Sequence, residues 1–394
     1  MRTPRTFHHL GSVAALSALV LTLVATPTAA AGKTRVVDDD GKGTAASCDA
    51  KTSALKSIQK AVDASGPGDI VKVCPGTYPG RVKISGARTG LRLLSTTPRG
   101  ATIKDPDSYL PVMPPLVLID GVADVVVKGF KVRTLSTGAY LPSQMDGITA
   151  NDAKNVTISG NDVSWSGAPG EISELLTGIT AKGGTTGIVK GNTIKDARVD
   201  GIFVTDAGTD VTVQGNTIDA EFAGDAAIEG DDGIEVSTGA KALVKANSII
   251  AANGSSAIIT KLSSGVRLYN ASAATVVRDN TITRPIVGIE THGNGYDLLD
   301  NGVLGRQIGI SLVSSDNLTV TGNTSKATAG SGYGISALEA SDGSTISGND
   351  VRGSSGADCF EDDGNNDGID NTWQDNQFND ATPSGLCAQD TVPR

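Results

Sequence analysis

Residues 200–218 read DGIFVTDAGTDVTVQGNTI, and this stretch contains the unit that decides the fold. The unit opens with Gly-Ile and a short apolar strand, crosses a gap, and ends in an alternating β-branched strand followed by Gly-Asn. The same unit recurs at residues 146–161 (DGITANDAKNVTISGN) and 232–249 (DGIEVSTGAKALVKANSI). Repetition of this kind indicates a solenoid, in which each unit can bury its inner face only against its neighbours.

An asparagine marks the same point of every unit, at successive spacings of 31, 24, 31, 33, 21, 22, 26 and 27 residues. The shorter spacings fit a coil of three short strands, and the longer ones add a loop. Strands stacked ~4.8 Å apart pair the backbone of each coil with both neighbours, and parallel crossovers are right-handed. We therefore expect an all-β, right-handed parallel β-helix in which the asparagines form a hydrogen-bonded ladder. The ladder residues are Asn161, Asn192, Asn216, Asn247, Asn280, Asn301, Asn323, Asn349 and Asn376.

The two ends of the solenoid need covers, because exposed strands invite aggregation. Leu55, Ile58 and Val62 recur at helical spacing, and Ser53 is a candidate N-cap, so a short capping helix is expected there. We expect one domain over residues 32–394, with an N-terminal cap at about 45–75, coils at about 70–356 and a C-terminal cap at about 357–394.

The first 31 residues have the pattern of a secretory signal peptide, with two arginines, an apolar run at residues 13–24 and an Ala-x-Ala site at residues 29–31. We therefore expect a secreted, extracellular protein. Without this segment 31 basic and 43 acidic residues remain, which gives a net charge of −12. Such a charge argues against nucleic acid and membrane as partners, but it permits a polysaccharide, even an anionic one if a local basic patch or a cation offsets the repulsion. The oligomeric state is left open.

Four cysteines in an exported chain suggest two disulfide bonds. They form one pair near each end of the chain. In an elongated fold only Cys48 with Cys74 and Cys359 with Cys387 can meet.

The N-terminal coil has a familiar pattern. Residues 57–62 (SIQKAV), 66–73 (GPGDIVKV) and 75–78 (PGTY) resemble the cap and first coil of pectin lyase-like β-helix proteins, and the later Gly-Asn-Thr-Ile units resemble the repeats of that superfamily. The resemblance implies the fold. It does not select an activity, because the superfamily includes lyases, hydrolases, epimerases, tailspikes and non-catalytic members.

One outward face of the predicted helix collects charged residues. In each Gly-Ile strand the isoleucine points inward, so the residues one and three positions later point outward. Stacking the coils brings the candidate catalytic residues Asp200, Asp231, Asp232, Glu235, Lys261 and His292 into one patch, together with Glu290. Paired carboxylates suit glycoside hydrolysis, or a Ca²⁺ ion that neutralises a uronate for a lyase with Lys261 as base.

Residues 230–234 (GDDGI) resemble the Gly-Asp-Asp motif of polygalacturonase-like hydrolases, in which Asp231 and Asp232 would supply acid and base and Asp200 would position water. The Gly-His-Gly that this family carries on the next coil is missing, since residues 253–255 read NGS. Asp-Gly is also a common turn pair, so the alternative is that these aspartates only shape turns.

A second acidic site lies near the C-terminus. Residues 363–368 (DGNNDG) match the opening of a calcium loop, but Gln374 stands where the loop requires glutamate. The candidate metal ligands are Asp363, Asn365, Asp367 and Asp370, and a solvated acidic turn is the alternative. Aromatic candidates for sugar contacts are Trp165, Tyr140, Tyr296 and Tyr333, whereas Trp373 is expected to pack in the cap.

These observations predict an extracellular protein that binds or cleaves a polysaccharide, most readily an acidic one, by lyase or hydrolase chemistry. The alternative is a non-catalytic β-helix that serves as a surface, adhesion or structural module.

Overall fold

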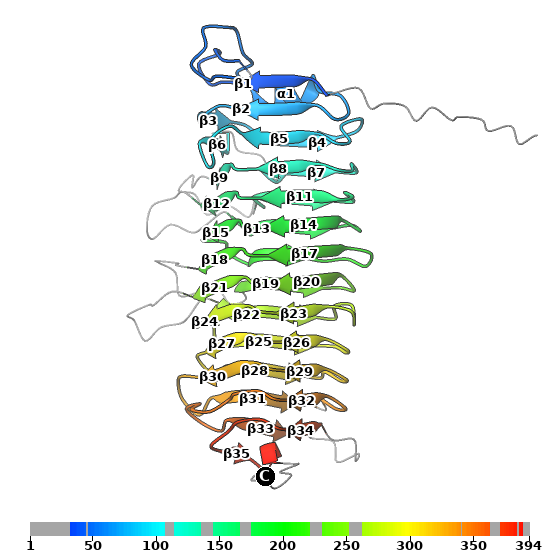
Figure 1. Cartoon of the computed structure of the whole chain (residues 1–394), viewed down its shortest axis with the longest axis vertical. Coiled ribbons are helices and arrows are strands. Elements are labelled where there is room, and N and C mark those ends of the chain that lie inside the picture. The colour runs from blue at the N-terminus through cyan, green and yellow to red at the C-terminus, as the bar shows by residue number, and fades with distance from the viewer. Residues whose placement is uncertain are drawn as a thin grey trace, which may run out of the picture. The chain divides into compact units, whose positions relative to one another are not determined.

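The computed structural model divides the chain into residues 1–31 and a compact unit of residues 32–394. Within the second unit the structure describes residues 32–44, 46–106, 114–134, 145–165, 175–220, 231–251, 262–339, 341–362, 371–383 and 386–388. These residues form three parallel sheets that stack coil upon coil (Figure 1). No helix among them is both long and apolar enough to cross a lipid bilayer.

The first sheet has 13 strands: β1 (Thr34–Val37), β2 (Ile70–Val73), β5 (Arg92–Ser95), β8 (Val126–Lys128), β11 (Val156–Ser159), β14 (Thr186–Lys190), β17 (Asp210–Gln214), β20 (Lys241–Lys245), β23 (Val276–Arg278), β26 (Asp297–Leu299), β29 (Thr319–Thr321), β32 (Thr345–Ser347) and β34 (Thr372–Gln374).

The second sheet has 12 strands: β4 (Val82–Ser85), β7 (Val117–Asp120), β10 (Ile148–Asn151), β13 (Thr177–Lys182), β16 (Asp200–Val204), β19 (Asp231–Ser237), β22 (Leu262–Tyr269), β25 (Val287–His292), β28 (Ile308–Val313), β31 (Tyr333–Leu338), β33 (Cys359–Asp362) and β35 (Ala381–Thr382).

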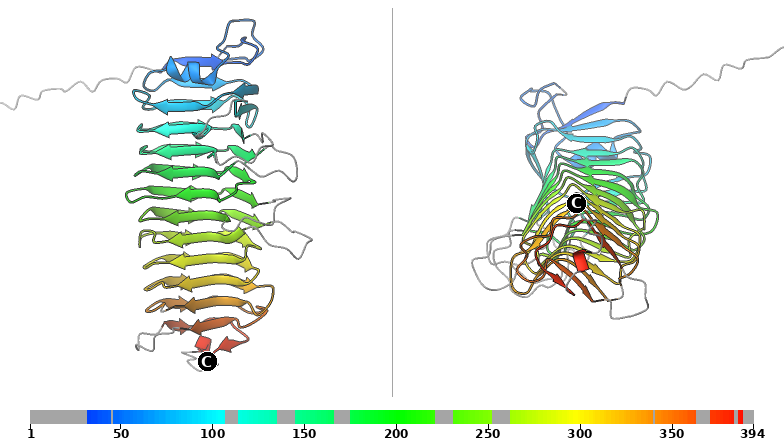
Figure 2. Two further views of the ribbon diagram at one scale, coloured as in Figure 1. Left: turned by 180° about the vertical axis from the view of Figure 1, so that it is seen from behind. Right: turned by 60° about the horizontal axis from the view of Figure 1, so that its bottom comes forward.

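The third sheet has 10 strands: β3 (Gly76–Pro79), β6 (Ala101–Lys104), β9 (Lys131–Thr134), β12 (Asp162–Trp165), β15 (Thr193–Lys195), β18 (Thr217–Ala220), β21 (Ser248–Ala251), β24 (Thr281–Thr283), β27 (Gly302–Gly305) and β30 (Thr324–Ala327). Along the chain the coils from β2 to β31 visit the first, third and second sheets in turn, whereas the strands from β32 to β35 alternate between the first and second sheets. Figure 2 shows the stack of coils from behind and from a tilted view. The predicted right-handed parallel β-helix is therefore confirmed.

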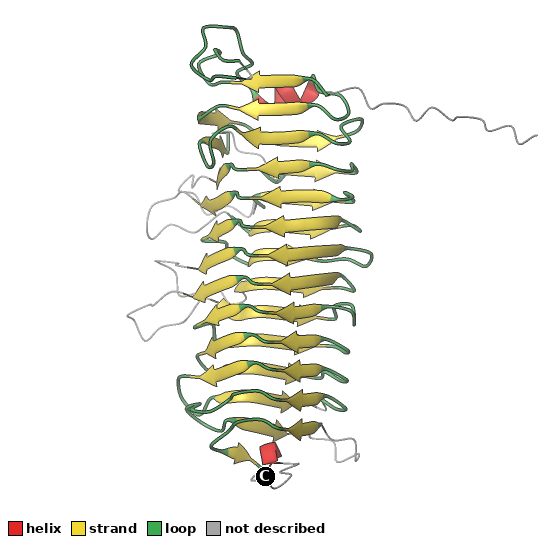
Figure 3. Cartoon of the chain, in the orientation of Figure 1, coloured by secondary structure: helices red, strands yellow, loops and turns green. Residues whose placement is uncertain are grey.

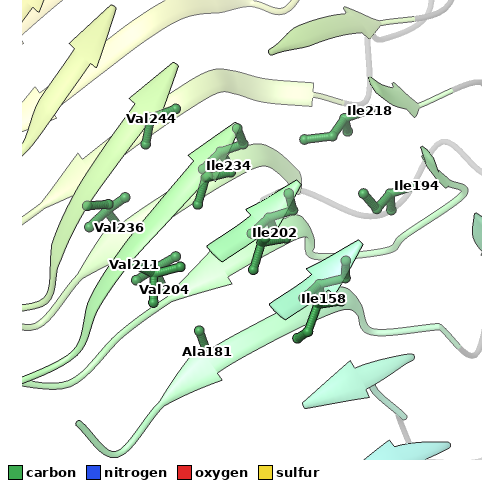
Figure 4. Close-up of a cluster of buried hydrophobic side chains, with 14 of the residues drawn as sticks. Ile158, Ala181, Ile194, Ile202, Val204, Val211, Ile218, Ile234, Val236 and Val244 are labelled. Atoms are coloured by element: carbon green, nitrogen blue, oxygen red, sulfur yellow. The ribbon is translucent and has the colours of Figure 1, made fainter. Parts of the chain in front are cut away.

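The core consists of thin aliphatic layers stacked along the coil axis (Figure 4). In the second sheet the inner position is filled in successive coils by Ile179, Ile202, Ile234, Val266 and Ile289, all of them fully buried. β-Branched side chains suit this position because they pack well against neighbours on a pleated surface.

The predicted asparagine ladder is confirmed in full. Each side chain from Asn161 to Asn349 donates through Nδ2 to the Oδ1 atom of the next asparagine, at 2.9–3.1 Å. The left-handed backbone conformation at this turn falls on the residue before the asparagine. Gly160, Gly191 and Gly215 have φ angles of 64°, 61° and 62°, whereas the asparagines themselves stay outside that region. Glycine suits this turn because it enters positive φ without steric cost.

A short helix, α1 (Ile58–Asp63), packs against β1, β2 and β4 at the N-terminal end (Figure 3). Its N-cap is Ser57, whose side chain accepts from the Lys60 N–H, so the expected cap at Ser53 is wrong. Leu55 pairs with Val37 in a bridge before the helix begins. The sheets also start earlier and end later than the expected coil limits, with β1 at one end and β34 and β35 at the other.

Disulfide bonds join Cys48 to Cys74 and Cys359 to Cys387, as the chain spacing predicts. Trp373 is fully buried near the second bond and donates from Nε1 to Glu361 at 3.0 Å, which confirms its role in packing. The C-terminal segment also contains a short 3₁₀ helix, η1 (Leu386–Ala388).

Candidate functional site

The candidate site lies on the outer face of the second sheet, across strands β16, β19, β22 and β25. The strand register aligns its residues in three columns along the coil axis. The first column runs Asp200, Asp232, Ser264 and Val287; the second runs Phe203, Glu235, Arg267 and Glu290; and the third contains Ser237, Tyr269 and His292.

A column of glycines separates the first of these columns from the inward isoleucines. A Cβ atom on Gly233 would lie 2.5 Å from the carbonyl oxygen of Gly265 and 2.6 Å from Ile249. Gly201, Gly265 and Gly288 meet the next coil in the same way, so each must remain glycine. The residue before each of these glycines varies, from aspartate in two coils to serine and valine in the next two, so this position is under no such constraint. Asp200 and Asp232 stand within strands, and the alternative that they only shape turns is wrong.

Asp232 lies at the base of the site and is only 1% exposed. Its Oδ1 atom accepts from the Ser264 N–H at 3.0 Å, and its Oδ2 atom lies 3.6 Å from Nη1 of Arg267. Burial raises its pKa to about 7, against the attraction of Arg267 and with added repulsion from Glu235 and Glu290. Both the neutral and the charged form of the Asp232 carboxyl are therefore populated near neutral pH.

Glu290 and His292 form a hydrogen-bonded pair at the surface. His292 Nε2 and Glu290 Oε1 are 2.6 Å apart, and the Ser264 hydroxyl donates to Glu290 Oε2 at 2.7 Å. The bond to His292, followed by the bond to Ser264, holds the pKa of Glu290 below its usual value although partial burial acts the other way. Glu290 is thus a fixed anion that orients the imidazole ring.

Arg267 occupies the centre of the site, among Asp232, Glu235 and Glu290. Its nearest distances to these carboxylates are 3.6, 4.0 and 4.0 Å, which are ion-pair distances and longer than hydrogen bonds. Among the described residues its guanidinium makes no hydrogen bond, and its side chain is 33% exposed. Its Nε atom is buried, so the N–H donors of Arg267 that an incoming anion can reach are those of the Nη atoms.

Tyr269 borders the site on the same strand and is one of the two large hydrophobic side chains that stand exposed in the described structure, at 44%. Its ring centroid lies 5.0 Å from the Arg267 guanidinium carbon and 5.4 Å from the His292 ring. Arg267, Tyr269 and the Glu290–His292 pair thus meet on the outer surface of two adjacent strands.

A second group of carboxylates lies beside this surface. One oxygen from each of Asp200, Asp232 and Glu235 lies within 4.8 Å of the others. Carboxylate oxygens are the ligands that Ca²⁺ prefers, so these three residues are the described group that could hold it.

The structure brings together Asp200, Asp232, Glu235, Glu290 and His292 of the predicted patch, and their catalytic role stays a prediction. Lys261 lies outside the described residues, and the outward position expected for it, next to Ser237, belongs to Tyr269. The reason is the register of β22, in which Gly265 and Val266, and not residues 257 and 258, lie beside Gly233 and Ile234. A separate bulge places one extra residue, Ser263, between the partners of Asp231 and Asp232. Asp231 lies in β19, but its side chain is outside the described set.

Other predicted sites have mixed outcomes. The proposed calcium ligands Asp363, Asn365, Asp367 and Asp370 all lie outside the described residues. Tyr296 is fully buried and donates to the His292 carbonyl at 3.0 Å, so its expected place on a sugar-binding loop is wrong. The column that carries Asp200 and Asp232 continues on the next coil with Ser264, so the histidine of the polygalacturonase-like motif is absent there too.

A family model described as right handed beta helix region matches residues 117–303. No curated protein matches the sequence. Among solved structures, the A-module of a mannuronan C-5 epimerase from Azotobacter vinelandii is 16% identical, with a TM-score of 0.51 over 83% of this chain and 97% of that one.

Two further structures are similar at low identity. An alginate lyase from Paenibacillus sp. is 14% identical, with a TM-score of 0.52 over 84% of this chain and 98% of that one. The catalytic unit of an α-1,3-glucanase from Streptomyces thermodiastaticus is 15% identical, with a TM-score of 0.53 over 88% and 69%. At these identities the likeness establishes the shared fold.

Proposed function

We propose that this protein is a secreted enzyme that acts on a uronate-containing polysaccharide by removing the C5 proton of a uronate. The observation that supports this function is the meeting of Arg267, Tyr269 and the Glu290–His292 pair on one outer surface. Each group has a place in such a reaction. The similar solved structures include an epimerase and a lyase of uronate polymers, which agrees with this choice.

Arg267 would bind the substrate carboxylate. A planar guanidinium binds a carboxylate through two parallel N–H bonds, and neutralising that charge acidifies the adjacent C5–H. Asp232 lies beneath Arg267 and is too buried to touch a polymer, so it serves as a positioning residue.

His292 would take the C5 proton. Its Nε2 atom bonds to Glu290, which orients the ring and leaves Nδ1 for the substrate. As the C5–H bond breaks, a C4–C5 double bond forms and the C4–O bond to the next sugar breaks. The leaving oxygen takes a proton from the Tyr269 hydroxyl. Return of a proton to the opposite face of C5 would instead give the epimer.

Ca²⁺ is a proposed addition to this site. The oxygen donors of Asp200, Asp232 and Glu235 fit it in kind, and the bound ion would add positive charge beside the substrate. Arg267 already supplies a cation to two of these carboxylates, so assays with Ca²⁺ and with EDTA measure what the ion adds.

A hydrolase is the second candidate, because Glu235 and Glu290 flank Arg267 in one column. Two coil steps separate their backbones by ~9.6 Å, near the carboxylate spacing of inverting glycosidases. This reaction would leave new reducing ends without a double bond.

The test is incubation with alginate, polygalacturonate and a neutral glucan, followed by ultraviolet absorbance for unsaturated ends, a reducing-end assay and NMR for C5 inversion. His292→Gln and Arg267→Met should each lower the rate by about 10²-fold or more, whereas Arg352→Met, at an exposed ion pair with Asp350 outside the site, should not. Unsaturated products formed at full rate by His292→Gln would refute the assignment. Binding to a glycan array with no product from any polymer would support the non-catalytic module instead.

Secretion and the single domain of residues 32–394 belong to the same proposal. Both disulfide bonds favour an oxidising compartment. N-terminal sequencing of the protein recovered from culture medium tests cleavage after residue 31.

A further inference from the structure

The outer face of the first sheet carries a column of basic residues at its edge with the third sheet. The register of β8, β11, β14, β17, β20 and β23 aligns one outward position through six successive coils. Its occupants are Lys128, Ser159, Lys190, Gln214, Lys245 and Arg278. Figure 1 shows these strands stacked with their C-terminal ends aligned.

The charges of this basic column repeat every second coil. Lys128, Lys190 and Lys245 are separated by two strand spacings each, or ~9.6 Å, and Arg278 follows one spacing later. The inward neighbours Val127, Val189 and Val244 are buried, which fixes the lysines on the outer surface.

The three lysines have no ion-pair partner among the residues that the structure describes. Acidic residues on the adjoining face are already paired, since Asp162 binds Arg133 and Asp219 binds Lys195. Arg278 is paired with Asp279 at 2.8 Å. The three lysines of the basic column therefore present uncompensated positive charge on a protein whose net charge is −10.

Further positions fit a surface for an extended chain. Ile188 and Leu243, two residues before Lys190 and Lys245, are half-buried and place apolar surface beside the charges. Lys72 continues the same column towards the N-terminus and lines a cavity of about 370 Å³ together with Leu94 and residues 46–48.

We propose that the basic column is a second, non-catalytic binding surface for an anionic polysaccharide. An extended polymer lying along the coil axis would place negative groups against several lysines at once, and such multivalent contacts reinforce one another. At physiological salt the screening length of about 8 Å is shorter than the spacing of the lysines. The lysines therefore repel one another only weakly, and each can bind its own negative group on the polymer. A nucleic acid fits less well, because the chain is acidic and the basic column has no aromatic side chains to stack on bases.

The inference is independent of catalysis, because this surface and the proposed active site lie on different sheets. Its test is equilibrium binding of the whole protein to polygalacturonate and alginate over a range of salt concentrations. We compare a column variant (Lys128→Glu, Lys190→Glu, Lys245→Glu) with a matched variant (Lys154→Glu, Lys195→Glu, Lys241→Glu). The matched lysines are ion-paired, and both variants change the net charge equally.

The column variant should lose about tenfold or more in affinity at low salt, with a shallower salt dependence. The matched variant should bind within about threefold of the wild type. Thermal midpoints check that both fold. Equal losses in the two variants, no loss in the column variant, or tighter binding of a DNA duplex than of either polysaccharide would overturn the proposal. Loss of binding with unchanged activity on short oligosaccharides would separate this surface from the active site.

Discussion

Replacing Asp232 by asparagine should stabilise the protein, and the gain should grow as the pH rises. Asp232 is 1% exposed, and burial raises its pKa to about 7 from an ordinary value of 3.8. An acid whose pKa is higher in the folded state binds its proton more tightly there. Its stabilising contribution is therefore complete below about pH 4 and is lost as the pH rises through about 7.

The size of the effect follows from these two pKa values. At 1.36 kcal/mol per pKa unit the wild type loses about 4 kcal/mol in all, of which about 2.5 kcal/mol falls between pH 5 and pH 8. An asparagine keeps the shape of the side chain without ionising, so the variant should escape this loss. The charged groups that face Asp232 are Arg267, Glu235, Glu290 and Asp200. They are present in the wild type and in the variant alike, so they affect the difference in stability only through their interaction with the charge of Asp232.

The measurement is chemical denaturation of the wild type and Asp232→Asn at several pH values from 5 to 8. The difference in unfolding free energy should rise steadily in favour of the variant. Asp210→Asn is the control, because this exposed carboxylate pairs with Lys241 at the surface and should change stability by no more than about 0.5 kcal/mol. A difference between wild type and Asp232→Asn that stays flat across this range would refute the reasoning.

Two further predictions concern the scaffold. Asn216→Ala should lower the unfolding free energy by about 3 kcal/mol, because Nδ2 donates to Val189 and Asn247 and Oδ1 accepts from Asn192. In the same denaturation assay Gln214→Ala, at an outward-facing position, should change the unfolding free energy by less than about 0.5 kcal/mol. Equal losses of stability in Asn216→Ala and Gln214→Ala would contradict a structural role of the ladder. Replacing Cys48 and Cys74 together by serine should cost about 3 kcal/mol, since the bond closes a loop with a sequence separation of 26 residues. An unchanged thermal midpoint in the double variant would count against that contribution.

The fold could be predicted from the sequence because each coil repeats the same physical requirements. A buried amide must be hydrogen-bonded, and a ladder of amides meets this need, so the asparagines recur at the turn between the first and third sheets. A glycine in contact with the next backbone admits no side chain, so Gly201, Gly233 and Gly265 recur as well. These constraints are local, and a single sequence displays them.

The site was predicted only in part, and the reason lies in β22. Either residue 257 or Gly265 could be the residue that aligns with Gly233 on the next coil. Both choices give a coil length within the range of the other coils, so spacing alone could not decide between them. Close backbone packing at Gly265 decides the register, and this register brings Arg267 and Tyr269 into the site. The run Ser264-Gly265-Val266 was the signal that could have indicated this register, because it keeps a glycine before an inward β-branched residue.

The asparagine ladder also has a direction. Every amide between Asn161 and Asn376 presents its oxygen towards the N-terminal neighbour and its nitrogen towards the C-terminal one. The side-chain dipoles therefore add along the coil axis, with the negative pole at Asn161, where the Phe130 N–H meets it at 3.0 Å. Aligned dipoles polarise one another, so each added coil strengthens the bonds already formed. The ladder thus acts as one cooperative chain of amides, and a break at its middle would weaken it more than the loss of an end.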